Sequence, residues 1–352
     1  MHWLRYTVLP FSYLYGGILS FRDLLFEKGI LKIERVKATV VSVGNLSVGG
    51  TGKTPHVDWL ASRFKEKVLS AVLLRGYGRK TKGFMLVGPN AKPETVGDEA
   101  LLYKSTHGDK LVVAVCEKRV EGAKRILELH PKTELIILDD AFQHRYIHRD
   151  VNILLTDYSA LFYKDFVMPV GRLREFRFQK RRADVVVVTK CPDNLTALEK
   201  ERIRNKMKLS ADVLLCFSKI KYGNVIPFFS SEFEVPEKVL LITGIATPEP
   251  LVEFWKKIAD VTHLSFPDHH DFTRRDIDKI HNKFDTFATH SQCIVTTSKD
   301  YVRLCAPEIK PLIKDYPWFY QEITVEIDNE EELLKKIYGY VEENRRSSSL
   351  PQ

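Results

Sequence analysis

A glycine-rich segment between two strongly patterned stretches constrains the fold of this chain more than any other feature. Residues Ser47 to Thr54 read SVGGTGKT, directly after the apolar run 37–45 and at the start of the helical pattern 54–67. Glycines let backbone N–H groups point at phosphate oxygens, and the N-terminus of the following helix favours the same negative charge. The segment fits the Walker A pattern except at its first position, where Ser47 replaces glycine. We therefore expect a strand, a phosphate-binding loop and a helix, in that order.

The residue types within this loop indicate how it would hold a nucleotide. Lys53 would reach the β- and γ-phosphates, and the hydroxyl of Thr54 would bind Mg²⁺. The backbone of the other loop positions would surround the phosphates: Ser47, Val48, Gly49, Gly50, Thr51 and Gly52. Such loops occur in kinases, GTPases and other ATPases, so the loop alone does not identify the reaction.

Short apolar runs alternate with helical stretches after residue 36. The runs predicted to be strands in this part are 37–45, 70–75, 111–115, 135–140, 151–157 and 184–190. Near-continuous apolar strands separated by helices indicate a parallel sheet that is covered on both faces. Ligands of such sheets bind beyond the carboxyl ends of the strands. The polar residues predicted at those ends are Arg75, Asp139, Asp140, Asp157 and Lys190.

A phosphate-binding loop of this type needs a carboxylate across the sheet to hold magnesium. The predicted strand 135–140 ends in two candidates, Asp139 and Asp140. One of the two could instead cap the next turn. We expect Asp139 to be the metal ligand, with Asp140 as the alternative or as a contact to the metal or its water.

The alternation of strands and helices is interrupted between residues 213 and 238. Lys221 to Asn224 read as a hairpin turn, and Ser230 to Pro236 are polar with few strand formers. We therefore expect an α/β chain in which a P-loop NTPase-like, mostly parallel sheet domain is joined by a β-hairpin-like linker to a smaller α/β domain. Strand and helix patterns of the second domain lie at 239–258, 293–300, 319–327 and 328–343, and the expected domain ranges are 36–230 and 236–345.

Residues 1–35 form a separate N-terminal segment that is rich in Leu, Phe, Tyr and Trp. Pro10 and the pair Gly16-Gly17 interrupt it, and Arg22 and Asp23 close it, so it falls short of the ~18–20 apolar residues needed to span a bilayer. No small-residue cleavage site follows a clean apolar region, which argues against a signal peptide. A buried first helix and an interfacial helix lying on a membrane both fit the residues.

The composition is that of a globular protein. The 352 residues are 44% hydrophobic and 28% charged, which excludes a disordered chain and an integral multi-span membrane protein. The net charge of +8 is compatible with a polyanionic partner, such as nucleic acid, an acidic membrane surface or a phosphorylated substrate. The five cysteines are far apart without a C-x-x-C pair, so a disulfide framework and a cysteine zinc site are both unsupported.

Three further segments place polar groups where apolar strands end. Asp98 and Glu99 precede an apolar helix, where they are either helix caps or site residues. The segment 169–182 holds six cations against one acid, which suits a solvated helix face or the binding of an anionic amphiphile. The segment 264–272 gathers Asp268, His269, His270 and Asp271. This last cluster matters more if the two domains face each other across a nucleotide.

Seven motifs together make the pattern specific. VGNLSVGGTGKTP, LLRGYGR, VGDEA, LDDAFQH, PVGRLRE, VVTK and FPDHH follow one another in this order. The chain thereby resembles the tetraacyldisaccharide 4′-kinases of lipid A biosynthesis over nearly its whole length. The resemblance implies transfer of the γ-phosphate of ATP, with Mg²⁺, to the 4′-hydroxyl of a tetraacylated glucosamine disaccharide 1-phosphate. It also implies a peripheral, monotopic monomer at the cytoplasmic face of the inner membrane of a Gram-negative bacterium, without a nucleic-acid partner.

The resemblance also implies roles for individual residues. The catalytic Asp of the family's GDE motif falls on Asp98, and the assisting His of its F-x-D-H motif falls on His269. Lys53 would stabilise the transferred phosphate, and Glu99 would assist the metal. The residues implied to bind the substrate are Arg75, Tyr77, His144, Arg172 and Arg174.

This sequence departs from the family pattern at three places. Ala141 stands where glycine is usual, and Phe176 stands where proline is common; both concern the shape of a loop rather than a reacting group. The doublet His269-His270 leaves open which histidine would partner Asp98.

Two other classes of protein are weaker alternatives. A regulatory GTPase would read guanine with an N/T-K-x-D loop, but 189-TKCPD-193 has Pro192 at the position of the Asp. A nucleic-acid-dependent P-loop ATPase would use the positive charge to bind phosphates.

Overall fold

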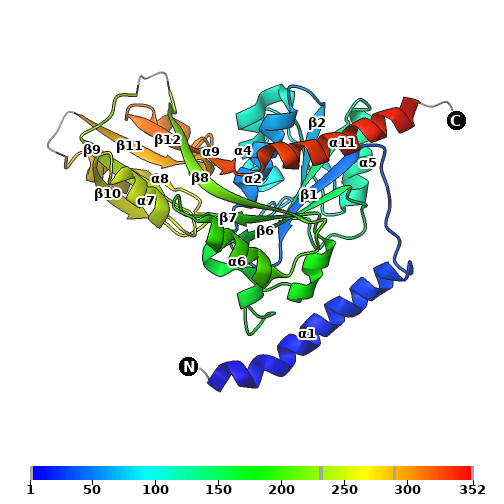
Figure 1. Cartoon of the computed structure of the whole chain (residues 1–352). Helices are drawn as coiled ribbons and strands as arrows, with labels where there is room; N and C mark the ends of the chain where they lie inside the picture. Colours follow the sequence, from blue (N-terminus) through cyan, green and yellow to red (C-terminus); the bar gives the residue numbers. More distant parts are fainter. Residues whose placement is uncertain (1–2, 230–232, 288–290, 350–352) are drawn as a thin grey trace.

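Two lobes share one continuous sheet. The computed structural model describes residues 3–229, 233–287 and 291–349, and within them twelve strands lie in the order β10-β9-β11-β12-β8-β7-β6-β1-β5-β2-β4-β3 (Figure 1). Neighbouring strands are parallel except for β3 with β4 and β8 with β12. The predicted α/β fold with a mostly parallel sheet is thus confirmed.

The strands of the N-terminal lobe are those predicted from the apolar runs, with a short edge strand added. They are β1 (Thr39–Asn45), β2 (Ser70–Leu74), β3 (Met85–Leu86), β4 (Val112–Val115), β5 (Leu135–Asp139), β6 (Val151–Asp157) and β7 (Val185–Thr189). Every residue of β1, β2, β4, β5 and β7 is buried. These strands are mostly apolar because helices cover both faces of the sheet.

The two faces carry different helices. On one face, α2 (Lys53–Phe64), α4 (Asp98–His107) and α11 (Glu330–Ser349) pack on residues such as Val41. On the other face, α5 (Arg119–Leu129) and α6 (Ala197–Met207) complete two further clusters, one of which contains Val40. Val40 and Val41 fall on opposite faces because side chains alternate along a strand. The four-residue α3 (Pro93–Val96) precedes α4.

One long strand joins the lobes. The start of β8 (Leu214–Pro227) pairs with β7 in parallel, and the rest of β8 pairs with β12 (Trp318–Ile327) in the antiparallel direction. The linker between the lobes is therefore a two-stranded antiparallel ribbon. Ser230 and the two residues after it lie outside the described residues.

The hairpin turn predicted at Lys221–Asn224 is wrong, because these residues lie inside β8. The local sequence favours a turn at these residues, but the strand continues through them. A register shift in β12 between Gln321 and Ile323 lies opposite, and the side chain of Gln321 donates from Nε2 to the carbonyl of Gly223 (2.9 Å). Pairing with a second strand thus overrides the local turn signal.

The C-terminal lobe continues the same sheet with parallel strands. Its strands are β9 (Lys238–Thr243), β10 (Asp260–Ser265) and β11 (Gln292–Thr297), and its helices are α7 (Glu249–Trp255), α8 (Arg274–Phe284), α9 (Ser298–Leu304) and α10 (Lys310–Ile313). Two apolar clusters lie on either side of these strands, one around Trp318 and one around Trp255.

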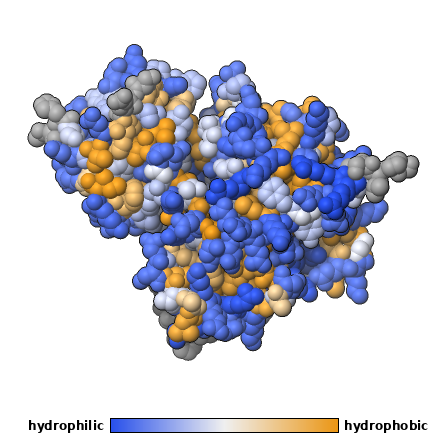
Figure 2. Space-filling view, turned by 45° about the horizontal axis from the view of Figure 1, so that its top comes forward, coloured by the Kyte–Doolittle hydropathy of each residue, from blue (hydrophilic) through white to orange (hydrophobic). Residues whose placement is uncertain are grey.

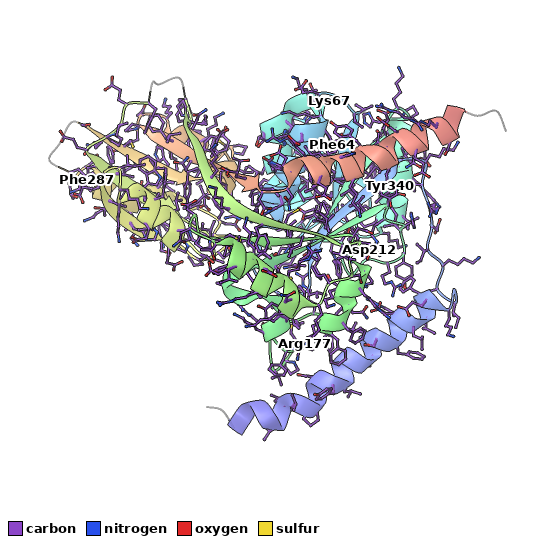
Figure 3. The ribbon with its side chains drawn as sticks, viewed as in Figure 1. Phe64, Lys67, Arg177, Asp212, Phe287 and Tyr340 are labelled. Carbon is purple, nitrogen blue, oxygen red and sulfur yellow. The ribbon has the colours of Figure 1, made fainter. Side chains whose placement is uncertain are left out.

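The last helix returns to the N-terminal lobe. Leu333, Ile337 and Val341 of α11 belong to the same buried cluster as Phe64 of α2. The rings of Tyr338 and Phe64 lie 4.5 Å apart, and Figure 3 shows Phe64 beside α11. The domain ranges 36–230 and 236–345 stay a prediction, to which the structure adds that α11 packs on the first of the two lobes.

The first helix lies along the outside of the molecule. α1 (Trp3–Glu27) runs below the N-terminal lobe in Figure 1 and packs on it at the buried residues Ser12, Asp23 and Phe26. Asp23 is buried and forms ion pairs with Arg145 (3.2 Å) and Arg182 (3.7 Å), while Arg22 pairs with the buried Glu175 (3.2 Å). None of the helices in the described ranges is both long and apolar enough to cross a membrane.

The packing of α11 gives a testable prediction. Ile337→Ala removes a side chain that is fully buried between α11 and the sheet, so we expect a loss of about 2–5 kcal/mol in the free energy of unfolding. Lys335→Ala on the exposed side of the same helix is the matched control and should change it by less than about 0.5 kcal/mol. Urea unfolding followed by circular dichroism measures both. Equal effects of the two variants would mean that α11 is not part of the core.

Candidate active site

The phosphate-binding loop connects β1 to α2, and its backbone requires glycine at two places. Gly49 and Gly52 have φ angles of 108° and 81°, which L-residues with a side chain rarely adopt. The end of β7 supports the loop from outside. Thr189 donates from Oγ1 to the carbonyl of Thr51 (2.9 Å), and Lys190 donates from Nζ to the carbonyl of Gly50 (2.6 Å). The loop is therefore held by the neighbouring strand.

A buried histidine connects this loop to the linker strand. Nδ1 of His56 lies 2.7 Å from the carbonyl of Gly52, and Nε2 lies 2.8 Å from the hydroxyl of Ser218 on β8. A carbonyl only accepts, so Nδ1 carries the proton and Nε2 accepts from the hydroxyl. Burial lowers the pKa of His56 to about 4, so the ring is neutral at neutral pH. His56 was not singled out from the sequence, where a histidine after the loop gives no distinctive signal.

Asp139 and Asp140 lie beside the loop at the end of β5. Oδ2 of Asp140 is 3.8 Å from Nζ of Lys53, and its Oδ1 accepts from Nη1 of Arg174 (2.8 Å). Oδ2 of Asp139 accepts from the hydroxyl of Tyr103 on α4 (3.0 Å). The two carboxylates therefore have different surroundings: Asp139 is buried against a neutral tyrosine, and Asp140 lies between two cations.

The electrostatics at Asp139 fit a divalent cation. Burial raises the pKa of Asp139 to about 6, and the charges of Asp140 and Glu99 act in the same direction, against Lys53. A cation at this position would relieve the repulsion among these carboxylates. In the described part of the chain no three His, Cys, Asp or Glu residues form a complete metal site. Mg²⁺, which binds proteins through one or two carboxylates and takes substrate phosphates as further ligands, suits such a set.

The two lobes meet where Asp98 faces His269. Asp98 begins α4 in the N-terminal lobe, and His269 lies in the loop after β10 in the C-terminal lobe. Nδ1 of His269 is 3.2 Å from Oδ2 of Asp98. His270 instead contacts Asp276 of its own lobe (3.1 Å) and stacks on the ring of Phe266. Of the two histidines that the sequence left open, His269 is the one that contacts Asp98.

A third residue takes part in this contact, although the sequence analysis does not single it out. Arg303 of α9 donates to Oδ2 of Asp98 from both Nε (2.8 Å) and Nη2 (2.6 Å). Lys299 on the same helix lies 3.6 Å from Glu99. The segment 297-TSKDYVRL-304 carries both cations. The predicted strand 293–300 included its first half, but the strand ends at Thr297 and α9 begins at Ser298, so no signal in the sequence indicated that these cations lie on a helix facing the other lobe.

A cavity of about 1510 Å³ extends between the lobes and contains most of the expected site. All of the predicted site residues line it except Ser47, Asp98 and Arg172. Asp98 contacts His269, which lines the cavity. In the space-filling view an indentation separates the two lobes, and on that face hydrophobic patches are scattered among hydrophilic ones (Figure 2). One end of the cavity reaches Tyr15, Leu19 and Arg22 of α1.

The expected substrate-binding residues separate into two groups. Arg75, Tyr77, His144 and Arg174 line the cavity. Arg172 is largely exposed on the surface and pairs with Asp165 (3.3 Å). Burial, with the nearby arginines, lowers the pKa of His144 to about 4, so this ring is a neutral hydrogen-bonding group at neutral pH.

Comparisons with known proteins agree with this arrangement. Residues 4–342 match the family model LpxK: Tetraacyldisaccharide-1-P 4'-kinase. The tetraacyldisaccharide 4'-kinase of Bacteroides fragilis (strain YCH46) is 40% identical over 97% of this chain and 95% of the relative. The protein of the same name from Cytophaga hutchinsonii is 43% identical over 95% of each chain. A crystal structure of "apo" form LpxK from Aquifex aeolicus in complex with ATP is 32% identical, with a TM-score of 0.74 over 95% of this chain and 98% of that chain.

The burial of Asp139 predicts a pH-dependent cost in stability. The pKa rises from 3.8 in the unfolded chain to about 6 in the folded protein, so the folded state binds the extra proton and stability falls as pH rises through this window. Asp139→Asn removes the charge but keeps the size. Without divalent cations, the variant should gain up to about 3 kcal/mol relative to the parent between pH 4 and pH 8. Urea unfolding in the presence of a chelator measures this, and a difference that does not change with pH would contradict it.

Proposed function

The chain belongs to the tetraacyldisaccharide-1-P 4'-kinase family, and we propose that it transfers phosphate at the contact between Asp98 and His269. It is an ATP-dependent kinase of lipid A biosynthesis that phosphorylates the 4′-hydroxyl of a tetraacyldisaccharide 1-phosphate. The resemblance seen in the sequence is thereby confirmed, and the GTPase and nucleic-acid-dependent alternatives are not favoured. The observation that carries the proposed site is the pairing of one residue from each lobe beside a cavity that holds the phosphate-binding loop.

ATP occupies the loop end of the cavity. The likeness to an LpxK that was crystallised with ATP supports binding of this nucleotide. The backbone from Val48 to Thr54 surrounds the phosphates, and Lys53 stabilises the charge that develops during transfer. Mg²⁺, when bound, neutralises the phosphate oxygens. The groups placed to hold it are Thr54, Asp139 and Asp140, with Glu99 close enough to assist.

Asp98 acts as the general base for the sugar hydroxyl. A bond forms between the 4′-oxygen and the γ-phosphorus, while the bond from that phosphorus to the β–γ bridging oxygen breaks and ADP leaves. The proton of the hydroxyl passes to the carboxylate of Asp98. His269 orients this carboxylate through the contact to Oδ2. Because phosphoryl transfer depends mainly on positioning and charge, a base held between two lobes contributes when the lobes are closed.

The disaccharide lies between the loop and α1. Arg75, Tyr77, His144 and Arg174 line this part of the cavity and offer hydrogen-bond donors to the sugar and its phosphate. The cavity then continues to Tyr15 and Leu19 of α1, which would contact the acyl chains.

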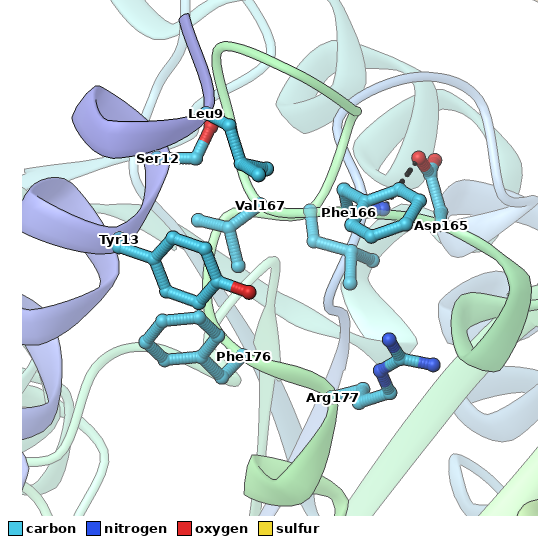
Figure 4. A pocket seen from close by; sticks show the side chains of 9 residues that line it. Leu9, Ser12, Tyr13, Asp165, Phe166, Val167, Phe176 and Arg177 are labelled. Atoms are coloured by element: carbon cyan, nitrogen blue, oxygen red, sulfur yellow. Dashed lines mark hydrogen bonds between the residues drawn. The ribbon is translucent and has the colours of Figure 1, made fainter. Parts of the chain in front are cut away.

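A second, smaller cavity supports the proposal that the apolar part of the substrate lies beside α1. It measures about 150 Å³ and lies between α1 and the segment 165–177. Figure 4 shows Tyr13 of α1 facing Phe176, with Phe166 and Arg177 on the opposite wall. Apolar walls with a cation at the rim suit an amphiphile.

α1 attaches the enzyme to the membrane surface. Phe11, Leu14, Ile18 and Phe21 recur at helical spacing, and each has more than 60% of its surface exposed. Such a stripe is unfavourable in water and suits burial at a lipid interface. The exposed cations nearby, Arg172, Arg177 and Arg181, would contact anionic headgroups. The stripe supports a peripheral, monotopic attachment to the membrane. In line with the family, we propose that the enzyme is a monomer on the cytoplasmic face of the inner membrane of a Gram-negative bacterium, without a nucleic-acid partner.

The catalytic assignment predicts how kcat changes in three variants. With γ-labelled ATP and tetraacyldisaccharide 1-phosphate, the parent should produce a labelled bisphosphorylated lipid. Asp98→Asn should lower kcat about 10³-fold and His269→Ala about 10²-fold, with ATP protection against proteolysis retained. His270→Ala is the matched control and should stay within about threefold, because His270 contacts only its own lobe among the described residues. Absence of labelled lipid with the parent protein refutes the function. An unchanged kcat in His269→Ala refutes the proposed pairing of His269 with Asp98.

The membrane assignment predicts loss of vesicle binding. Leu14→Glu with Ile18→Glu places two charges on the exposed stripe of α1, so binding to vesicles that contain anionic phospholipid should weaken about tenfold or more. Leu129→Glu changes an equally apolar residue that is 50% exposed on α5, and it should bind like the parent. Vesicle sedimentation measures both. Similar losses in the two variants would show that α1 has no special role.

A further inference from the structure

Arg303 reaches across the boundary between the lobes to the carboxylate of Asp98. It belongs to α9 in the C-terminal lobe and has 4% of its surface exposed. Nε and Nη2 of its guanidinium both donate to the same oxygen, Oδ2 of Asp98, at 2.8 and 2.6 Å. Hydrogen bonds between charged partners are short and directional, so this contact fixes the position of Oδ2.

The C-terminal lobe holds Arg303 in place independently of Asp98. Nη1 of Arg303 donates to Oδ1 of Asp300 (3.1 Å), which is fully buried. Oδ2 of Asp300 accepts from the backbone N–H of Gly244 (2.9 Å) and the hydroxyl of Thr297 (2.7 Å). The guanidinium is therefore preoriented within its own lobe, and little side-chain freedom is lost when it meets Asp98.

The loop that carries His269 is bound to the same unit. The backbone N–H of His269 donates to the carbonyl of Gly244 (3.2 Å), and the residue has a positive φ of 59°. Gly244 thus binds Asp300 through its N–H and His269 through its carbonyl. A Cβ at Gly244 would lie 2.8 Å from Oδ1 of Asp300, so a larger residue would disturb this unit. Arg303 and His269 therefore belong to one hydrogen-bonded unit of the C-terminal lobe.

The proton on His269 decides which contact Nδ1 makes. Nδ1 lies 3.2 Å from Oδ2 of Asp98 and 2.9 Å from Nη2 of Arg303. A guanidinium only donates, so its contact with Nδ1 is a hydrogen bond only when Nδ1 is unprotonated. The contact between Nδ1 and the carboxylate requires the opposite tautomer. In either tautomer Arg303 keeps its two bonds to Asp98, whereas His269 can lose its bond.

We propose that Arg303 is a positioning residue for the phosphate transfer, which holds Oδ2 of Asp98 so that Oδ1 receives the proton of the sugar hydroxyl. Within the described part of the chain Oδ1 has no hydrogen-bond partner, while Oδ2 has all three. Because Arg303 comes from the other lobe, the base is oriented only when the lobes are closed. The proposal rests on the role of Asp98 as the base, as given under the proposed function.

A purely structural ion pair is the competing explanation, since a buried guanidinium needs a carboxylate partner. Asp300 already satisfies that need from within the same lobe. The second partner is the residue that begins α4 beside Glu99, which lines the substrate cavity. The geometry therefore favours a role that acts through Asp98.

A double-mutant cycle separates the two explanations. Arg303→Met should lower kcat about 10²-fold, while the KM for ATP changes less than about threefold, because the phosphate-binding loop is untouched. Arg303→Lys should recover part of the loss, since an ammonium can hold Oδ2 but cannot also hold Asp300. In the background of Asp98→Ala, Arg303→Met should cost less than about threefold more. Arg275→Met, on the exposed side of α8, is the matched control and should leave kcat unchanged.

Three kinetic results would contradict the positioning role of Arg303. A parental kcat in Arg303→Met, an increase in kcat, or the same fold-loss with and without Asp98 would overturn the proposal. Hydrogen exchange of intact protein tests folding and closure directly: Arg303→Met should raise exchange at the start of α4 and in the His269 loop, and leave the core strand β5 protected. Loss of protection in β5 would show a structural role instead. If the parent protein transfers no phosphate, the proposed function fails; if the parent and Arg303→Met are equally active, only this inference fails.

Discussion

The antiparallel pairing of β8 with β12 connects the two lobes that together form the active site. β8 leaves the N-terminal lobe beside β7 and becomes part of the C-terminal lobe, so the backbone ladder crosses the boundary between them. Any movement of one lobe against the other must bend or twist this ribbon. The register shift between Gln321 and Ile323 is a place where such a ladder bends. Two hydrogen bonds of His56 connect the phosphate-binding loop to Ser218 of β8, which links the loop to the linker.

The ion pair between Arg303 and Asp98 is arranged so that separation of the lobes would leave neither group as a buried charge without a partner or solvent. A buried charge that loses its counter-ion is strongly destabilising. When Arg303 withdraws from Asp98, it keeps Asp300 within its own lobe. On the other side, Asp98 retains 16% side-chain exposure and can be solvated. The arrangement therefore allows a closed state with strong contacts and an open state without a large electrostatic penalty, which a kinase needs for substrate entry and product release.

Local patterns predicted the parts of the fold whose causes are local. The loop from Ser47 to Thr54 and the strands of the N-terminal lobe follow from glycines and continuous apolar runs, and their placement at one edge of the sheet follows from parallel topology. The prediction of a turn at Lys221–Asn224 was wrong because pairing with the distant strand β12 determines the backbone conformation there. The sequence did not indicate Arg303 for the same reason: it lies 205 residues from Asp98, and only the packing of the two lobes brings the two residues together. The family motifs supplied Asp98 and His269, which composition and spacing could not.

The shape of the cavity constrains the order of events. Water competes with the sugar hydroxyl for the γ-phosphate, so a lipid kinase must assemble its base only around the acceptor. One end of the cavity is the phosphate-binding loop, and the other is formed by Tyr15 and Leu19 of α1, the helix that carries the exposed apolar stripe. If α1 lies on the membrane as proposed, a lipid that enters from that side would pass α1 first and reach the lobe boundary last. Closure of the lobes around the sugar would then bring Arg303 and His269 onto Asp98 when the acceptor is already in place. Because ATP bound alone lacks the contacts with α1 and the sugar site, it provides less binding energy for closure than the complete complex.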